Sequence, residues 1–182
     1  MNEDICTVVP IDRRDLGSGD TAIYKTLQIM AELTIKAMSD PLVRWHAEDA
    51  VAGVPPGDDQ AEIDAVRRYL RERVTYRRDP QPVEWLQAPG WVIQCYLDKG
   101  RTAQLDCDDL SMLVAALLGS IGHRVAFRVI SMLPTEEYNH VIVMVYPESG
   151  PPVRVDLTEA WLPDGFPQAR ETRADEVPLW EE

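Results

Sequence analysis

The feature that most constrains this chain is a change in its hydrophobic period near residue 122. Over residues 106–120 apolar side chains fall on one helical face, which predicts an amphipathic helix. This stripe consists of Leu110, Leu113, Val114, Leu117 and Leu118. Farther along, apolar residues alternate in three segments, 125–129, 138–146 and 153–157, which predicts three strands. A helix followed by three strands with no helix between them predicts the α+β class, with an antiparallel sheet and no parallel pairing.

The N-terminal half of the chain predicts three further helices. The first begins after Asp20, its expected N-cap, and has apolar residues at spacings of three and four. The second starts at Asp40 and Pro41, because proline suits the first helical position. The third covers about residues 60–73, and a short buried segment is expected over 91–97.

A length of 182 residues is typical of one domain. Residues 1–19 have no sustained period and predict an extended N-terminal arm. The folded domain is expected over 20–165, followed over 166–182 by an acidic tail that wraps around it or hangs loose.

Charge and hydropathy exclude several partners. The net charge of −13 repels phosphate backbones, so nucleic acid is not expected as a partner. The longest apolar run, residues 112–118, is far shorter than the roughly 20 residues of a membrane span, so no membrane partner is expected. Neither GxGxxG nor GxxxxGK[ST] occurs, and no cofactor is expected.

The cysteines indicate a compartment. Cys6, Cys95 and Cys107 are odd in number and have no paired spacing, so neither a disulfide framework nor a CxxC zinc site is expected. The N-terminus carries acids where a secretory signal has basic residues. Both features favour a reducing, cytoplasmic location.

One segment runs against the acidic composition, because six arginines lie within residues 67–78. They are Arg67, Arg68, Arg71, Arg73, Arg77 and Arg78. The simpler interpretation is a solvated helix face that forms salt bridges with the acidic remainder. The alternative is a docking patch for an acidic protein surface.

Cys107 is the first candidate for chemistry. Asp106 is the expected N-cap of the 106–120 helix and Asp109 occupies its third position, an arrangement like a capping box. Cys107 then takes the first helical position, where free amides and the helix dipole favour a thiolate and hold an oxyanion. The surrounding carboxylates oppose the thiolate, and a free cysteine is often only a small buried apolar residue.

His140 and Asp156 are expected to meet on neighbouring strands. Alternation sets His140 on one face with Ile142, which we expect to be the face covered by the helix. Asp156 lies in an apolar segment where a carboxylate needs a partner. A hairpin centred near residues 148–149 sets His140 directly opposite Asp156. A strand histidine with a purely structural role is the alternative.

These three residues form the set used in nucleophilic acyl transfer. Cys107 attacks, His140 takes and returns the proton, and Asp156 orients the imidazole ring. His46 and His123 are weaker candidates, because one lies on a helix without an acidic strand partner and the other in a turn.

Three runs resemble the core of the transglutaminase-like superfamily: DCDDLSMLVAALLGSIGHRVAFRVI, NHVIVMV and VRVDLTEA. The resemblance covers about residues 63–161, and the stretch VTYRRDPQPVEWLQAP is most similar to versions encoded by tailed bacteriophages and prophages. It implies a papain-like fold in which Cys107, His140 and Asp156 are nucleophile, base and orienting acid. The chain departs from the pattern at Leu105, where a glycine is usual.

The same resemblance suggests residues for an oxyanion hole and for substrate contacts. Gln87 is the first candidate for the second oxyanion donor, because it lies in the stretch that resembles the family. Trp91, Gln94 and Gln104 are rivals, and Asp106 belongs to the same expected site.

Three functions remain open from the sequence. The first is a cysteine peptidase, amidase, deamidase or transglutaminase acting on a protein or peptide, in the host cytoplasm if the protein is phage-encoded. The second is a non-catalytic virion or assembly protein that retains the fold. The third is a metal site built from Cys107, His140 and nearby aspartates, although the chain lacks a compact ligand spacing.

Overall fold

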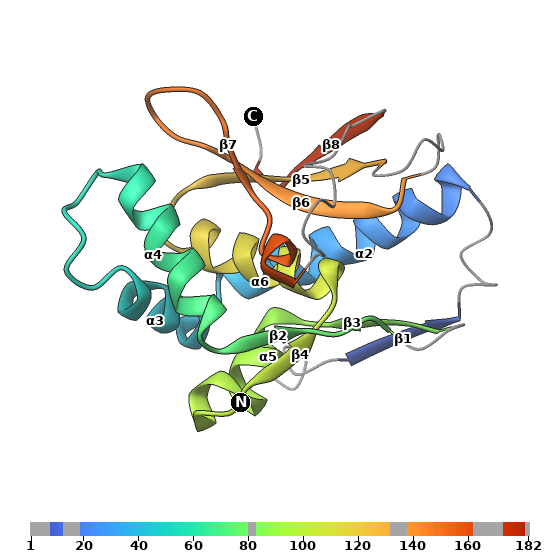
Figure 1. Cartoon of the computed structure of the whole chain (residues 1–182), viewed down its shortest axis with the longest axis horizontal. Coiled ribbons are helices and arrows are strands. Elements are labelled where there is room, and N and C mark those ends of the chain that lie inside the picture. Colours follow the sequence, from blue (N-terminus) through green and yellow to red (C-terminus); the bar gives the residue numbers. More distant parts are fainter. Residues whose placement is uncertain (1–7, 13–18, 80–82, 132–137, 162–172, 181–182) are drawn as a thin grey trace.

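A computed structural model describes residues 8–12, 19–79, 83–131, 138–161 and 173–180. Its secondary structure is mixed, with helices and mostly antiparallel strands, which confirms the α+β class. A four-stranded sheet forms one layer, α6 (Cys107–Ser120) runs through the middle, and two small sheets with α5 (Pro89–Cys95) lie on the other side (Figure 1).

The four-stranded sheet has the order β7-β6-β5-β8. Its strands are β5 (Arg124–Ile130), β6 (His140–Tyr146), β7 (Val153–Val155) and β8 (Ala174–Pro178). The first three follow the predicted segments and pair antiparallel, as expected. The fourth lies within the expected acidic tail and pairs with β5, so this part of the tail is an edge strand of the sheet.

Helix α6 is the centre of the apolar core, and its predicted stripe is buried. The helix ends at Ser120, and Gly122 adopts a φ of 104°, a left-handed conformation that favours glycine. Helix α2 (Asp20–Met38) packs against α6 where Gly119 meets Met38: a Cβ on Gly119 would lie 2.5 Å from the Met38 side chain. Glycine therefore permits this close approach.

The remaining helices follow the prediction with small shifts. Helix α2 includes Asp20 in its first turn, because Gly19 is the N-cap and no side chain caps this end. Helix α3 (Pro41–Ala50) starts as predicted, with Asp40 accepting a hydrogen bond from the Leu42 amide at 2.8 Å. Helix α4 (Asp59–Arg71) is capped by Asp58.

The short strands of the opposite layer were not predicted. β2 (Val74–Tyr76) pairs parallel with β4 (Ala103–Leu105), so the expectation of no parallel pairing is wrong. β1 (Val8–Asp12), the described part of the expected arm, pairs antiparallel with β3 (Val83–Gln87). Strands of three to five residues are too short to show a period, and long-range pairing selects them.

The expected buried segment over 91–97 is helical, formed by α5 and the start of the 3-10 turn η2 (Leu97–Lys99). A second 3-10 turn, η3 (Thr158–Trp161), follows β7. Helices long and apolar enough to span a bilayer do not occur in the described ranges.

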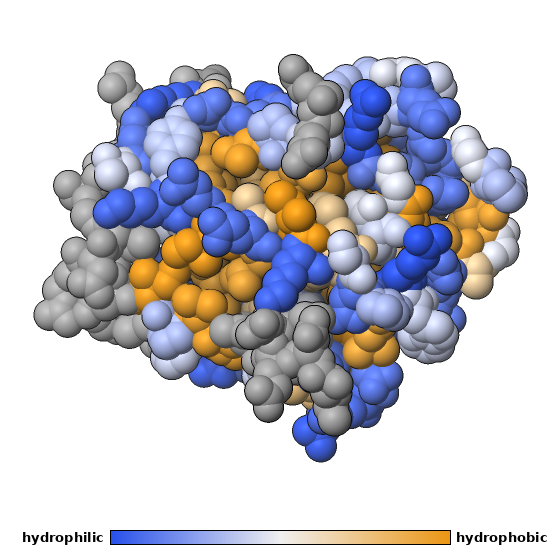
Figure 2. Space-filling view, turned by 180° about the vertical axis from the view of Figure 1, so that it is seen from behind, coloured by the Kyte–Doolittle hydropathy of each residue, from blue (hydrophilic) through white to orange (hydrophobic). Residues whose placement is uncertain are grey.

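Apolar side chains also reach the surface. Figure 2 shows apolar residues gathered among polar ones on the face seen from behind. Three large apolar side chains of the described chain are more than a third exposed: Ile35, Trp45 and Trp85.

Candidate active site

The N-terminus of α6 has the predicted cap. Asp106 accepts hydrogen bonds from the amides of Asp108 and Asp109 at 3.1 and 3.2 Å, and Cys107 is the first helical residue, as expected. Only half of the capping box forms, because the Asp109 carboxylate turns to β3. There it accepts from the Gln87 amide and from Gln87 Nε2, each at 2.7 Å.

Cys107 lies against the start of β6. Its half-buried thiol donates to Asp108 Oδ1 at 3.3 Å, and the nearby Val141 amide acts to lower the pKa of the thiol. One turn along the helix, Ser111 Oγ donates to the Val141 carbonyl at 3.1 Å. Two positions of α6 thus contact the backbone of the residue next to His140.

His140 is paired with Asp156. Its Nε2 lies 2.8 Å from Asp156 Oδ2, and both side chains are almost fully buried. Asp156 Oδ1 accepts from the Thr158 amide at 3.0 Å and from the Thr158 hydroxyl at 2.7 Å. Arg154 Nη2 lies 3.5 Å from Asp156 Oδ2. The carboxylate is therefore held from several sides.

The register between β6 and β7 differs from the predicted one. The prediction sets Val143 opposite Val153, whereas the structure pairs Val143 with Val155. Asp156 follows the last paired residue of β7 and approaches His140 diagonally rather than from directly opposite. Side chains of diagonal neighbours remain within reach, so the expected contact forms in spite of the shift.

The predicted orientation of β6 is wrong. Val141, Val143 and Val145 belong to the apolar core that includes α6, and Ile142 lies outside it. The face containing Ile142 is therefore not the one covered by the helix. His140 is the first residue of β6, and it meets the N-terminus of α6 at the end of the strand.

The remaining nitrogen of His140 is available for chemistry. Among the described residues, the ring contacts Asp156 and the Thr158 hydroxyl, the latter at 3.3 Å, and both contacts involve Nε2. Within the described ranges, Nδ1 has no hydrogen-bond partner, and the Cys107 thiol is bonded to Asp108 rather than to the imidazole. In the structure, His140 and Asp156 are therefore hydrogen-bonded to each other, and the Cys107 thiol is not hydrogen-bonded to His140.

Carboxylates dominate the electrostatics around the sulfur. Burial, followed by the charges of Asp108 and Asp106, raises the pKa of Cys107 well above its ordinary value. Burial also raises the pKa of Asp106 to about 7, with Asp79 and Glu84 acting in the same direction. Burial, with these charges acting in the same direction, outweighs the expected effect of the helix dipole on the thiol.

The neighbouring carboxyl groups shift in both directions. Burial and the charge of Asp106 raise the pKa values of Asp108 and Asp109. Burial acts to raise the pKa of Asp156 as well, but the hydrogen bonds and charge from His140 and Thr158 lower it overall. Asp156 is therefore the site carboxylate that stays ionised most readily.

Gln87 has a structural role in this arrangement. Its Nε2 donates to Asp109 Oδ2 at 2.7 Å and to the Gln104 carbonyl at 3.2 Å, so both amide hydrogens are engaged. These bonds do not support its assignment as an oxyanion donor. Trp91 packs edge to face on Tyr96, with ring centroids 5.4 Å apart, and no hydrogen bond or ring contact joins it to the three expected catalytic residues among those described.

The other histidines and cysteines have separate surroundings. His46 is buried with Nδ1 2.5 Å from the Tyr69 hydroxyl, and burial lowers its pKa. His123 Nε2 lies 2.8 Å from Glu62 Oε2. Cys95 is half-buried on α5, and Cys6 lies outside the described residues.

Two groups of side chains offer converging metal-binding atoms. In each group the ligand atoms lie within 4.8 Å of one another: Asp59, Glu62 and His123 in the first, Asp79, Glu84 and Asp106 in the second. Neither group contains Cys107 or His140, the residues of the metal site considered from the sequence, within the described part of the chain.

Comparisons with known proteins add little. No family model matches this sequence, and no curated protein matches it. The chain is similar to a crystal structure of a "putative protease" from Parabacteroides distasonis, with 13% identity and a TM-score of 0.42 over 73% of this chain. It spans 30% of that protein. A likeness at this level carries no conclusion about fold or activity.

Proposed function

We propose that the protein is a cysteine-dependent acyl-transfer enzyme that acts on an amide bond of a protein or peptide. Its catalytic residues are Cys107, His140 and Asp156, and the resemblance to transglutaminase-like, papain-like proteins supports the same assignment. The observation that carries the proposal is the bond of 2.8 Å between His140 and Asp156, beside the helix end that bears Cys107.

The proposed chemistry starts with proton transfer from Cys107 Sγ to His140 Nδ1. The sulfur attacks the amide carbon, and the carbonyl oxygen becomes an oxyanion. His140 returns its proton to the leaving nitrogen, the carbon–nitrogen bond breaks, and a thioester remains on Cys107. Water or an amine then attacks the thioester with His140 as base, which releases an acid or a new amide and restores the thiol.

Asp156 supports this cycle through Nε2. A carboxylate at 2.8 Å holds the ring with Nδ1 available and stabilises the imidazolium that forms during attack. The lowered pKa of Asp156 supports this role, because the carboxylate keeps its charge when the imidazole gains one. The Thr158 bonds hold the carboxylate in place.

The first oxyanion donor we assign is the amide of Cys107. In the first turn of α6 the amides of Asp108 and Asp109 are bound by Asp106, and the Leu110 amide donates to the Asp106 carbonyl. Within the described ranges, the Cys107 amide has no such partner. A free amide at the attacking residue suits an oxyanion that forms one bond away from the sulfur.

The raised pKa of Cys107 makes the base essential. A buried thiol surrounded by carboxylates is not ionised before the substrate binds. The transfer of its proton to His140 therefore has to accompany substrate binding or attack. We infer that a bound substrate displaces the thiol from Asp108 and turns it to Nδ1.

The test is incubation of the purified protein with a peptide library, followed by mass spectrometry. Hydrolysis, loss of ammonia from glutamine or incorporation of an added amine identifies the reaction. Cys107→Ala is expected to abolish every mass change, and Asp58→Asn, on the exposed end of α4, to leave it intact. Mass changes that persist in Cys107→Ala contradict the proposal.

The second candidate function is that of a non-catalytic virion or assembly protein with an idle triad. The observation in its favour is the raised pKa of Cys107, because a raised pKa keeps the thiol protonated and therefore unreactive. It predicts equal alkylation of accessible cysteines and no acyl-enzyme with any peptide, together with stable incorporation into a particle or assembly.

A further inference from the structure

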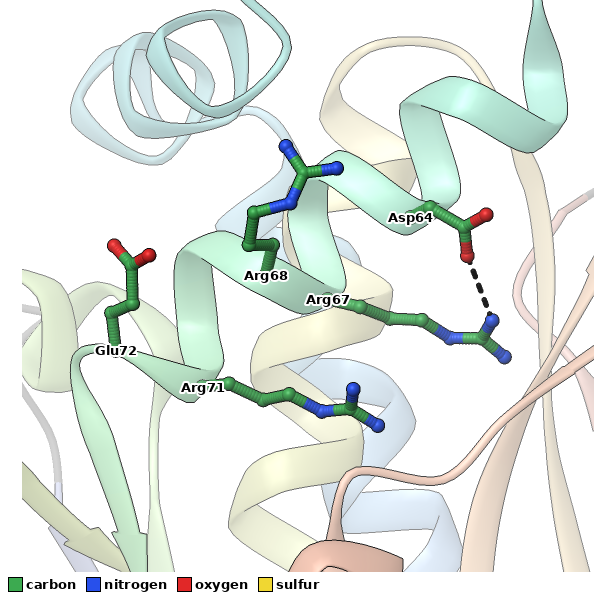
Figure 3. A pocket seen from close by; sticks show the side chains of 5 residues that line it. All are labelled: Asp64, Arg67, Arg68, Arg71 and Glu72. Carbon is green, nitrogen blue, oxygen red and sulfur yellow. Dashed lines mark hydrogen bonds and ion pairs between the residues drawn. The ribbon is translucent and has the colours of Figure 1, made fainter.

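The arginine run of α4 lines a pocket. Its volume is about 390 Å³, and five side chains of α4 and its C-cap line it: Asp64, Arg67, Arg68, Arg71 and Glu72. Arg67 and Arg71 are one helical turn apart and extend to the same side of the helix, whereas Arg68 turns to another side (Figure 3). The pocket therefore presents guanidinium groups to whatever enters it.

One of these arginines is held in place. Arg67 Nη1 donates to Asp64 Oδ1 at 3.0 Å, and Nη2 donates to the Arg154 carbonyl of β7. Two bonds from the same guanidinium restrict its rotation, so Arg67 forms a fixed wall of the pocket. Its charge is partly compensated by Asp64.

The other two arginines, Arg68 and Arg71, differ from Arg67. Arg68 and Arg71 are exposed and make no ion pair or hydrogen bond with any described residue. Glu72 lies at the pocket but bonds to Arg73 at 3.3 Å. In a chain of net charge −13, two guanidinium groups without an acidic partner among the described residues are a local exception. The simpler interpretation from the sequence, a solvated helix face with salt bridges, covers both the ion pair of Arg67 with Asp64 and the exposed side chains of Arg68 and Arg71.

The pocket lies close to the proposed catalytic residues. Arg67 bonds the carbonyl of Arg154, and the side chain of Arg154 lies 3.5 Å from Asp156 Oδ2. Asp156 in turn bonds His140. Arg154 therefore contacts both Arg67, at the edge of the pocket, and the proposed catalytic carboxylate.

We propose that this pocket is a subsite that binds the carboxylate of a glutamate or aspartate in the protein or peptide substrate, with Arg71 as the main contact. The proposal rests on the proposed function, because it takes the substrate to be a polypeptide that reaches Cys107. The planar fork of arginine matches a carboxylate in two parallel hydrogen bonds.

The surrounding charges favour one carboxylate over a polyanion. Asp64 and Glu72 border the pocket, so a polyanion bound there would meet two carboxylates. A nucleic acid would meet these acids and the overall charge of −13. An acidic side chain within an otherwise neutral segment matches the pocket better.

The experiment uses the full chain with Cys107→Ala, so that peptides bind without turnover. The probes are short acetylated and amidated peptides with one glutamine at a fixed position and one glutamate moved through the others. Matched peptides carry glutamine in place of the glutamate. Binding is measured by fluorescence anisotropy of the labelled peptides.

We expect glutamate at one position to tighten binding about tenfold over its matched peptide. Adding Arg71→Gln should remove this preference, so that each glutamate peptide binds as tightly as its matched glutamine peptide. Arg44→Gln is the matched control, because it removes the same charge from an exposed site on α3 paired with Glu48. It should retain the preference.

Three results overturn the subsite: no position prefers glutamate, the preference survives Arg71→Gln, or a single-stranded oligonucleotide binds more tightly than every acidic peptide. The proposed function is judged separately with the wild-type chain. An Arg71-dependent preference without turnover supports a carboxylate-binding pocket and contradicts the proposed enzyme. Turnover without the preference supports the enzyme and contradicts the pocket as a subsite.

Discussion

His140 and Asp156 are diagonal neighbours at the ends of β6 and β7, with Nε2 and Oδ2 2.8 Å apart. The space beside them is taken by Thr158, which bonds Asp156 through its amide and hydroxyl and lies 3.3 Å from Nε2. The imidazole is thus oriented by a carboxylate that is itself held by the first residue of η3. Rigid support of this kind is what a proton-transfer pair requires.

Asp156→Asn is expected to lower the rate of the acyl-transfer reaction by at least about a hundredfold. The amide retains the shape of the carboxylate but cannot stabilise the imidazolium that forms during attack. The measurement is the rate of peptide turnover at saturating substrate. Asp58→Asn, the same change at an exposed cap, should leave the rate unaltered, and comparable rates in both variants would argue against the triad.

Asp108→Asn is expected to speed alkylation of Cys107 by iodoacetamide at least about threefold near pH 8. The variant removes the acceptor of the thiol hydrogen and a negative charge beside the sulfur, so the pKa of Cys107 falls. Mass spectrometry of the modified peptide against pH measures the shift. Cys95 in the same molecule is the internal control, and an unchanged profile for Cys107 would show that Asp108 does not hold the thiol.

Asp106→Asn is expected to weaken the dependence of stability on pH. The pKa of Asp106 is about 7 in the folded chain, above its unfolded value, so the folded state binds more protons between about pH 4 and 7. Stability is therefore fully present below the unfolded pKa and falls as pH rises through the folded pKa. The upper bound on this loss is on the order of 4 kcal/mol.

The measurement is urea unfolding at pH 5 and pH 8. Asparagine keeps the N-cap, so the variant should unfold with a smaller difference between the two pH values than the wild type. Asp58→Asn is the matched control, because Asp58 caps α4 through the Ala61 amide at an exposed position. An equal change in both variants would mean that burial of Asp106 is not the cause.

Gln87→Ala is expected to destabilise the fold by about 1–3 kcal/mol, because it removes a hydrogen bond to the buried Asp109 carboxylate. If Gln87 only holds Asp109 in place, the activity measured on the folded fraction stays within a few-fold of wild type. If it is the oxyanion donor first considered, kcat falls by about a hundredfold with little change in stability. Urea unfolding together with kcat and KM separates these outcomes.

Sequence alone was sufficient for the features that depend on local pattern. The apolar stripe and Asp106 located α6 and placed Cys107 at its first position, and alternation located three strands carrying His140 and the segment before Asp156. These features depend on hydrogen bonds and side-chain periods that involve residues only a few positions apart, so the local sequence determines them.

Tertiary structure decided the features that depend on partners far along the chain. The register that brings Asp156 to His140, the bonds from Gln87 to Asp109, and the contact of Arg67 with Arg154 all join segments whose approach no local pattern encodes. The same is true of the thiol: the helix dipole at Cys107 is a local property, but burial and the packing of carboxylates around it set the direction of its pKa. Burial is a property of the whole fold, and its effect on a charge exceeds that of a helix end.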